Sequence, residues 1–404
     1  AYLIRALIRQ REKQGVRIYC HARAATREKA MERIVSNMEH FACWDERYRS
    51  FLIPVPGDLN KPRLGMDEAT WAQLSQEIDL IIHNGAVLNF VFPYDQLKRT
   101  NVLGTVECLR LACAGRAKYF HYVSSYSVLD NPSHFDKPAL ESDPLESPDG
   151  YFLGYSETKW VAEKLVDAAR QRGLRTAIYR PGDITGTQKD GIWNLGDLIS
   201  RSLVGCIQLG CVPDMQVNLH LTPVDYVAEA IVCIAFQSAS TGLAFHLINH
   251  SLMPLDQISD LLGRAGYPVK VLPYEEWCRR LTACTSQENA LRILSCLFTD
   301  QRLGIESLPQ RFGPRQAQFD TRNADRLLAS SGIQCPPVHV ALIRSYLRYF
   351  QRSGDLPAPA PLWRRLFSPR LPRCVAEKTS PAAGRSMAAL RGTLSSGYSE
   401  IGNA

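Results

Sequence analysis

A tyrosine and a lysine lie four residues apart, at Tyr155 and Lys159, and could form a proton-transfer pair. The stretch that follows keeps apolar residues at helical spacing, at Val161, Leu165 and Ala169, so both side chains are expected on one helix face. A phenol with an ordinary pKa of about 10 is a poor acid or base near neutrality. A neighbouring ammonium would lower that pKa, so the pair indicates general acid-base chemistry. Taken alone, the spacing is equally typical of a solvated helix.

Hydroxyl groups follow a strand-like run, 119–123, about thirty residues upstream of this pair. They belong to Ser124, Ser125, Tyr126 and Ser127. Ligands of parallel α/β sheets bind at the carboxyl ends of the strands, where one such hydroxyl can hydrogen-bond a reacting carbonyl. A serine pair after a strand is also common turn chemistry. The order of strand, hydroxyl and then Tyr-Lys helix is the more specific signal, and it favours carbonyl reduction or oxidation.

This order resembles the extended short-chain dehydrogenase/reductase family. The resemblance implies that Ser125, Tyr155 and Lys159 are the catalytic hydroxyl, tyrosine and lysine. Ser124 is the weaker candidate, because the catalytic hydroxyl in the family motif is the second of the two.

The elements that must position these residues alternate along the first half of the chain. Strands that alternate with helices predict a doubly wound, parallel, Rossmann-type sheet covered on both faces. After Gly186 helical segments dominate, which predicts a smaller, mostly helical C-terminal substrate lobe. Helices are expected at 2–14, 26–40, 255–264, 274–281 and 287–297, and strands at 16–20, 51–55, 79–83, 119–123 and 176–180.

These patterns divide the chain into regions. Residues 1–185 are expected to form the dinucleotide-binding domain, which about 217–250 would complete. Residues 186–216 and 251–352 would form the substrate and carrier-binding lobe, and the Pro-, Ala-, Ser- and Gly-rich 353–404 a flexible tail. The glycine-rich loop expected between the first strand and first helix is not in the sequence. We therefore expect that the first strand and this loop are missing from the chain, which weakens cofactor binding.

The resemblance also implies a cofactor and its site. Arg23 ends the second strand of such a fold, where an enzyme that prefers NAD carries an acidic residue. An arginine favours a 2′-phosphate, and Arg33, about three turns into the next helix, resembles a second phosphate-binding arginine, so NADPH is expected. Other implied cofactor-binding residues, besides Tyr155 and Lys159, are Asp58, Leu59, Asn84, Gly85, Ala86, Asn101, Pro181, Gly182 and Ile184. Asn101 would also support the active-site helix.

The second half of the chain narrows the resemblance to thioester reductase domains, which terminate nonribosomal peptide and polyketide assembly lines. The similar segments are 192–198, 205–210 and 221–228, and the likeness extends to about residue 352. It implies NADPH-dependent release of an acyl or peptidyl thioester as an aldehyde, with further reduction to an alcohol left open. The implied partner is a carrier protein with a phosphopantetheine-bound substrate, expected in the same polypeptide.

Other functions stay open. A sugar-nucleotide epimerase or dehydratase of the same fold would hold NAD and should carry an acidic residue near Arg23. A non-reducing, cyclising release domain would lack the tyrosine that stands at position 155. A scaffold or redox sensor that binds cofactor without turnover would not need the Tyr-Lys pair.

Composition excludes several other classes. The 404 residues are 45% hydrophobic and carry a net charge of +7 without long basic runs, so neither disorder nor nucleic-acid binding is expected. No apolar run is long enough to span a membrane. The twelve cysteines have no metal-site spacing, so we expect no metal and a cytoplasmic protein with reduced core cysteines.

Overall fold

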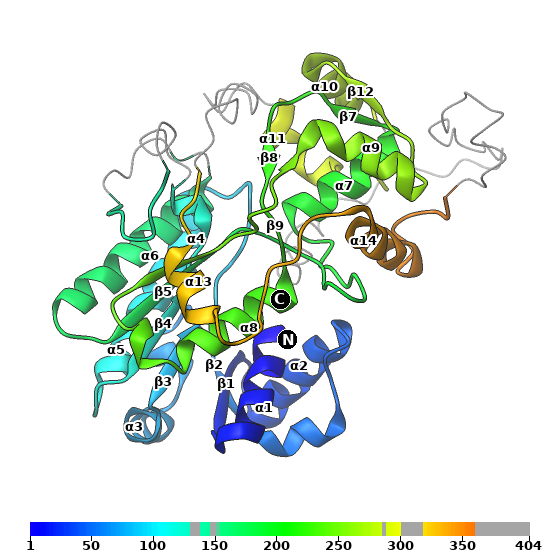
Figure 1. Cartoon of the computed structure of the whole chain (residues 1–404). Coiled ribbons are helices and arrows are strands. Elements are labelled where there is room, and N and C mark those ends of the chain that lie inside the picture. Colours follow the sequence, from blue (N-terminus) through cyan, green and yellow to red (C-terminus); the bar gives the residue numbers. More distant parts are fainter. Residues whose placement is uncertain (130–137, 146–150, 152, 285–287, 300–317, 360–404) are drawn as a thin grey trace, which may run out of the picture.

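The computed structural model describes residues 1–129, 138–145, 151, 153–284, 288–299 and 318–359. They form a parallel sheet flanked by helices and, beside it, a smaller lobe built around α7, α9, α10 and α14 (Figure 1). The bounds in the lobe are α7 (Leu198–Leu209), α9 (Leu255–Ala265), α10 (Tyr274–Ala283), α11 (Ser295–Thr299), α14 (Val340–Arg352), β7 (Cys211–Pro213) and β12 (Lys270–Leu272).

All pairings in the main sheet are parallel, in the order β10-β5-β4-β3. A separate parallel pair, β1-β2, has no hydrogen-bonded strand in common with it among the described residues. This arrangement confirms the expected doubly wound class of fold. The strands are β1 (Ile18–Arg23), β2 (Leu52–Gly57), β3 (Leu80–His83), β4 (Tyr119–Val123), β5 (Thr176–Pro181) and β10 (Ala244–Leu247).

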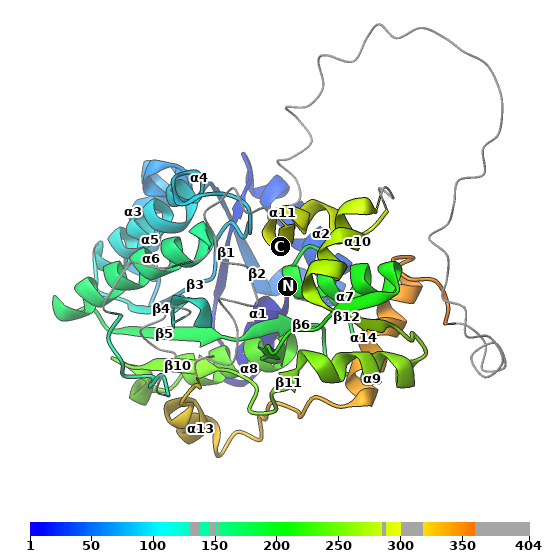
Figure 2. The same ribbon diagram turned by 90° about the horizontal axis from the view of Figure 1, so that it is seen from above.

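Helices flank the central strands on both sides (Figure 2), and residues of β4 pack into two different layers. Phe120 and Tyr122 of β4 pack with α5 and α6, whereas Val123 packs on the other face with α8 and α13. Every residue of β5 is buried, as expected for a strand covered on both sides. The helices around the sheet are α1 (Tyr2–Gln14), α2 (Arg27–His40), α3 (Glu68–Glu77), α4 (Tyr94–Lys98), α5 (Gly104–Cys113), α6 (Gly154–Gln171), α8 (Val224–Ala235) and α13 (Arg322–Leu328).

Short strands connect the sheet to the lobe. Just after β5, β6 (Asp183–Thr185) pairs in parallel with β9 (Leu221–Pro223), and β8 (Asn218–Leu219) pairs antiparallel with β11 (Met253–Pro254). The chain therefore enters the lobe at the carboxyl end of β5, the edge at which the reactive residues were expected.

Local signals explain where several helices begin and end. The Thr26 hydroxyl caps α2 by accepting from the backbone N–H of Lys29, and the Asp197 carboxylate caps α7 by accepting from Ser200 at 2.7 Å. Gly15 ends α1 with φ 68°, a left-handed conformation that favours glycine.

One expected helix, 287–297, is shorter in the structure, and Gln287 lies outside the described residues. A 3-10 turn, Arg292–Leu294, leads into α11. The reason is the Asn289 side chain, which donates to the Gly205 carbonyl and accepts from the Leu291 N–H. These bonds hold the backbone in a turn against α7 instead of a continuous helix.

Two segments pack differently from the expected regions. Ala324, Leu327 and Leu328 of α13 are buried with α8 and β10, so this helix lies against the sheet and not in the lobe. Residues just after 352 are not a free tail, because Leu356 is 3% exposed and the Pro357 carbonyl accepts from the Tyr267 hydroxyl at 2.7 Å. The rest of the predicted tail, 360–404, lies outside the described residues.

The cysteines that the structure describes are all free. The prediction that the cysteines are core residues is confirmed for five of them, which are buried: Cys20, Cys43, Cys108, Cys206 and Cys211. Cys113 is exposed, because it ends α5 on the side away from the sheet core, and the remaining described cysteines are half-buried.

Candidate active site

Tyr155 and Lys159 lie in the first two turns of α6, on the expected face. Lys159 is 3% exposed, and its ammonium donates to the Val123 carbonyl at the end of β4 over 2.7 Å. The same nitrogen lies 4.7 Å from the centre of the Tyr122 ring. These contacts tie the start of α6 to the carboxyl end of β4.

The helix start is further held by a close backbone contact. A Cβ added at Gly154 would lie 2.5 Å from the backbone nitrogen of Tyr94 and 2.7 Å from the Phe92 carbonyl oxygen. Only glycine allows the loop before α4 to pack so closely on the first turn of α6. Tyr155 is therefore placed by backbone packing as well as by Lys159.

The electrostatics of the pair differ from the expectation. Burial raises the pKa of Tyr155 above its ordinary value of 10.0, where the sequence predicted that Lys159 would lower it. The ammonium of Lys159 is directed to the Val123 carbonyl. Burial lowers the pKa of Lys159 to about 7, with a smaller opposing effect from Glu163. In this arrangement Tyr155 is a neutral hydrogen-bond donor.

The two serines after β4 have different surroundings. The Ser124 hydroxyl is buried and donates to the Glu163 carboxylate at 2.7 Å. Ser125 is half-buried, and its hydroxyl accepts from the Ser127 N–H at 3.2 Å. A hydroxyl that accepts can still donate, so this geometry favours Ser125 over Ser124 as the group that meets a substrate.

A buried network that the sequence reasoning missed supports this corner. Glu163, one turn beyond Lys159 on α6, pairs with Arg180 of β5, and both side chains are almost fully buried. Arg180 also contacts the His246 ring of β10 at 3.1 Å, and Glu163 accepts from Ser124. Arg180 was the signal in the sequence, because an arginine within an otherwise apolar strand needs a buried partner of opposite charge.

Asn101 is buried in a π-helical turn, Arg99–Leu103, and reaches α6 as expected. Its amide nitrogen donates to the Thr158 hydroxyl at 3.0 Å and to the Val87 carbonyl at 3.0 Å. Its amide oxygen accepts from the Val87 N–H at 2.7 Å. The residue thus links the loop after β3 to the turn between Tyr155 and Lys159.

The residues expected at the adenine follow β2, and those expected beside the cofactor backbone follow β3. The Asp58 carboxylate accepts from the Asn60 N–H at 2.9 Å, which shapes the turn after β2. Leu59 contacts the next turn, since a Cβ at Gly85 would lie 2.6 Å from its Cδ1. Asn84 and Gly85 are exposed, and Ala86 is half-buried.

The segment expected beside the nicotinamide crosses from β5 to β6. Pro181 ends β5, and the Gly182 N–H donates to the Leu247 carbonyl at 3.0 Å. A Cβ at Gly182 would meet the His220 carbonyl oxygen at 3.0 Å, so the close crossing requires glycine. Ile184 leaves 39% of its surface exposed at this edge, available to an apolar ring face.

The two arginines expected at a 2′-phosphate lie on neighbouring elements. Arg23 is the exposed last residue of β1, and Arg33 is exposed on α2. The helix begins at Arg27, so Arg33 lies about two turns in, and not three. The roles of all these cofactor residues stay predictions.

The described residues contain neither a metal-binding cluster nor a membrane-spanning helix. No group of three or more His, Cys, Asp or Glu is arranged to bind a metal ion there. None of the helices in that part of the chain is long and apolar enough to cross a membrane.

Comparisons with known proteins agree with this fold. The family described as "Male sterility protein", an NAD-binding family, matches residues 1–231. The L-2-aminoadipate reductase large subunit of Eremothecium gossypii is 34% identical over 375 residues, covering 88% of this chain and 26% of that protein. A linear gramicidin synthase of Brevibacillus parabrevis is 33% identical over 361 residues, covering 88% of this chain and 7% of that protein.

The chain thus spans about a quarter or less of the length of these two curated relatives. A solved structure matches it along nearly its whole length. The terminal R domain from the myxalamid PKS-NRPS biosynthetic pathway is 40% identical, with a TM-score of 0.82 and 89% of each chain covered. On these findings the chain belongs to the NAD-binding male sterility family and is an NAD(P)-dependent reductase domain similar to the R domains of nonribosomal peptide and polyketide synthases.

Proposed function

We propose that this chain reduces an acyl or peptidyl thioester, held on a carrier protein, to an aldehyde at the expense of NADPH. The observation that carries the proposal is the placement of α6. The Lys159 ammonium donates to the Val123 carbonyl at the end of β4, Tyr155 precedes Lys159 by one helical turn, and the half-buried Ser125 follows β4.

The chain's own residues supply hydrogen bonds and a proton. Ser125 and Tyr155 donate to the thioester carbonyl oxygen, and these bonds strengthen as negative charge develops on it. Such donors are worth about 3 to 4 kcal/mol each in comparable sites. The raised pKa of Tyr155 suits this role, because the phenol stays protonated until the oxygen becomes basic. Loss of the thiol from the resulting hemithioacetal then leaves the aldehyde.

The residues present fit a dinucleotide along the carboxyl edge of the sheet. The turn after β2 would contact its adenine, the turn after β3 would lie beside its backbone, and the exposed Ile184 would face its nicotinamide ring. NADPH, when bound, supplies the hydride for the carbonyl carbon. Arg23, where NAD enzymes have an acid, favours the 2′-phosphate form. The same absence of an acid gives the sugar-nucleotide epimerase alternative no support.

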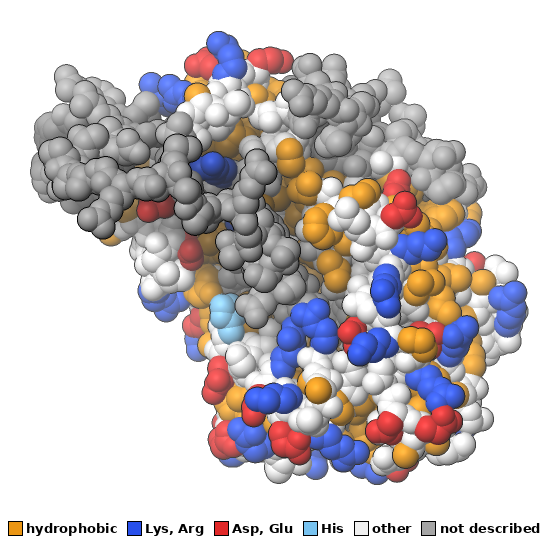
Figure 3. All heavy atoms as spheres, turned by 180° about the vertical axis from the view of Figure 1, so that it is seen from behind, with side chains coloured by type: hydrophobic (Ala, Val, Ile, Leu, Met, Phe, Trp, Pro, Cys, Tyr) orange, Lys and Arg blue, Asp and Glu red, His pale blue; other side chains and the backbone are white. Residues whose placement is uncertain are grey.

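The proposed partner is a carrier protein that presents its substrate on phosphopantetheine, between the sheet edge and the lobe. Overall charge gives little guidance about its docking face. Figure 3 shows basic and acidic side chains interspersed over the lower part of one face, and hydrophobic side chains gathered above them.

Replacing the tyrosine tests the proposal. In the whole protein with a carrier-bound acyl thioester, Tyr155→Phe should lower thioester-dependent NADPH oxidation about 100-fold or more, because the chief hydrogen-bond donor is lost. Tyr119→Phe is the matched control, since this tyrosine lies at the opposite end of β4 and its hydroxyl accepts from exposed Arg175. Full activity of Tyr155→Phe would refute the assignment.

A further inference from the structure

The lobe contains a partly open cavity of about 220 Å³, which the proposed chemistry has not used. Its walls come from α7, the β7–β9 segment, α9, α10 and α14. Most of the lining is aliphatic or aromatic. The residues that line it include Leu198, Leu203, Leu219, Leu255, Leu262 and Trp277.

The few polar groups in the lining are uncharged, with one exception. Asp183 carries the single carboxylate among the described residues that line the cavity, and none of these residues is Lys or Arg. The Trp193 indole N–H is turned to the Asp197 carboxylate at 2.7 Å, so this ring presents carbon to the cavity. The described residues that line the cavity therefore include no cation to neutralise an anion.

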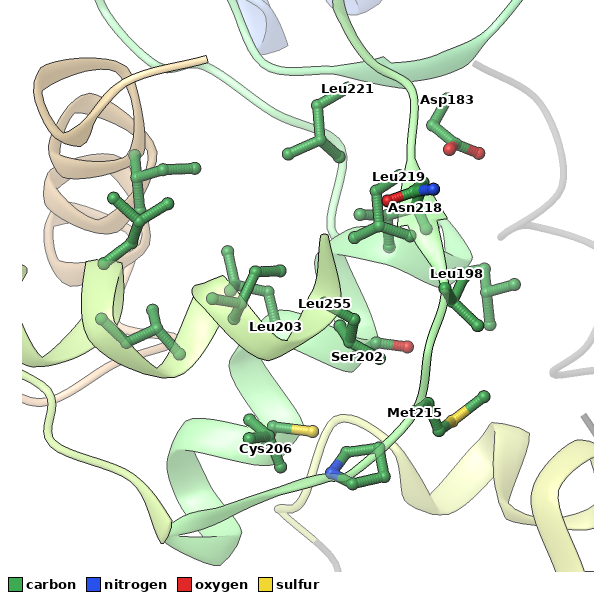
Figure 4. A pocket seen from close by; sticks show the side chains of 18 of the residues that line it. Asp183, Leu198, Ser202, Leu203, Cys206, Met215, Asn218, Leu219, Leu221 and Leu255 are labelled. Atoms are coloured by element: carbon green, nitrogen blue, oxygen red, sulfur yellow. The ribbon is translucent and has the colours of Figure 1, made fainter. Parts of the chain in front are cut away.

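The cavity reaches the candidate active site at one end. Tyr126 directly follows Ser125, and Asp183 directly follows Gly182. Their side chains line the cavity together, with the Tyr126 hydroxyl donating to Asp183 at 2.9 Å. Figure 4 shows Asp183 on one side of the pocket and Cys206 on the other, with Leu219 and Leu255 between them.

We propose that this cavity binds the acyl chain of the thioester, and that the preferred substrate carries an unbranched or lightly branched apolar chain without a terminal charge. The inference rests on the proposed thioester reduction, because it places the reacting carbonyl beside Ser125. A carbonyl there and a chain directed past Asp183 toward Cys206 would follow the cavity that Figure 4 shows.

The cavity volume limits the chain length. An apolar protein cavity of about 150 Å³ admits benzene, with six carbon atoms. On that scale a cavity of about 220 Å³ holds roughly nine carbon atoms. Affinity should therefore rise with chain length up to about eight or nine carbons. A carboxylate at the end of the chain would be desolvated without a cation and would weaken binding.

Binding of thioether analogues tests the proposal without turnover. S-ethyl pantetheine, S-octyl pantetheine and an equally long analogue ending in a carboxylate would be titrated calorimetrically into the protein. Each fully buried methylene is worth up to about fourfold in affinity. The octyl analogue should bind at least about tenfold more tightly than the ethyl analogue and the carboxylate analogue. Affinities within about twofold of one another, or tighter binding of the carboxylate, would overturn the proposal.

A pair of serine substitutions locates the effect. Ser202 lies between Leu198 and Cys206 on the cavity face of α7, and Ser202→Phe should fill the space and remove most of the preference for octyl. Ser259→Phe is the matched control, because Ser259 is half-buried next to the lining residue Ile258 but does not line the cavity. Equal loss in both variants would contradict the assignment.

The outcomes separate this inference from the function on which it rests. Tight octyl binding without NADPH-dependent reduction of octanoyl-pantetheine would preserve the pocket and reject the proposed reaction. Reduction of ethyl-length and octyl-length thioesters with equal efficiency, together with equal binding of their analogues, would preserve the reaction and reject the pocket.

Discussion

The carboxyl edge of the sheet and the cavity of the lobe are neighbours with opposite chemistry. At the edge, polar and charged side chains are buried with hydrogen-bond partners. Glu163 pairs with Arg180, and the Lys159 ammonium donates to the Val123 backbone carbonyl. In the lobe, most of the described residues that line the cavity are apolar, and the one carboxylate among them belongs to Asp183 of β6, just after β5.

The difference separates two tasks within one chain. Reaction at a carbonyl needs donors held rigidly in place, and a network of buried hydrogen bonds supplies that rigidity. Selection of an apolar chain needs only shape and dry surface. Changes at the edge should therefore damage rate or stability severely, whereas changes in the cavity should shift preference among substrates.

The largest effect is expected from Lys159→Met. This change keeps much of the apolar stem and removes the group that orders the corner, so kcat should fall about 100- to 10,000-fold. Steady-state NADPH oxidation measures it. Activity close to that of the unchanged protein would show that the polar edge is not the reaction centre.

Lys159→Met should also change how the free energy of unfolding depends on pH. Burial lowers the pKa of Lys159 from 10.5 to about 7, so between these values the unfolded chain holds a proton that the folded chain has lost. The free energy of unfolding therefore gains a contribution that grows as pH rises from about 7 to 10.5. Denaturation at several pH values should show this slope in the unchanged protein relative to Lys159→Met. Parallel curves for the two proteins would contradict it.

The next largest effect is expected from Glu163→Gln. Arg180 would keep a buried charge without its carboxylate, at a cost of about 3 to 5 kcal/mol in unfolding free energy. Glu229→Gln is the control, because its pair with Arg9 is exposed and should contribute about 1 kcal/mol or less. Chemical denaturation compares the two. Similar losses would mean that the network adds no special rigidity.

The smallest effect is expected from Asn101→Ala. Loss of its bonds to Val87 and Thr158 should lower kcat about tenfold, since α6 loses one of its supports. A double-mutant cycle with Thr158→Val isolates the contact with the helix. Fully additive effects in kcat would show that Asn101 does not act through Thr158.

Some features followed from local patterns and were predictable. The helix with Tyr155 and Lys159, the strand before Ser125 and the cap at Thr26 each depend on spacing within a few residues. Strand and helix alternation likewise indicated a parallel sheet. The packing of Phe120 and Val123 on opposite faces is the period-two consequence of that sheet.

Other features depend on contacts between distant segments, which spacing does not reveal. Glu163 and Arg180 meet only because α6 lies across β5, and the protonation of Tyr155 depends on how deeply the fold buries it. The cavity combines residues from Tyr126 to Ile343. The packing of α13 on the sheet could not be predicted either, because its apolar residues could pack equally well against the sheet or in the lobe.

The central claim is tested most directly by the products of the whole protein acting on a carrier-bound acyl thioester. The aldehyde, the freed carrier thiol and the NADPH consumed would be measured together. Reductive release predicts that thiol release requires NADPH, with one equivalent consumed per thiol when the product is the aldehyde and two when the aldehyde is reduced further to an alcohol. Release of the thiol at the same rate without NADPH, leaving an acid or a cyclised product, would contradict the account.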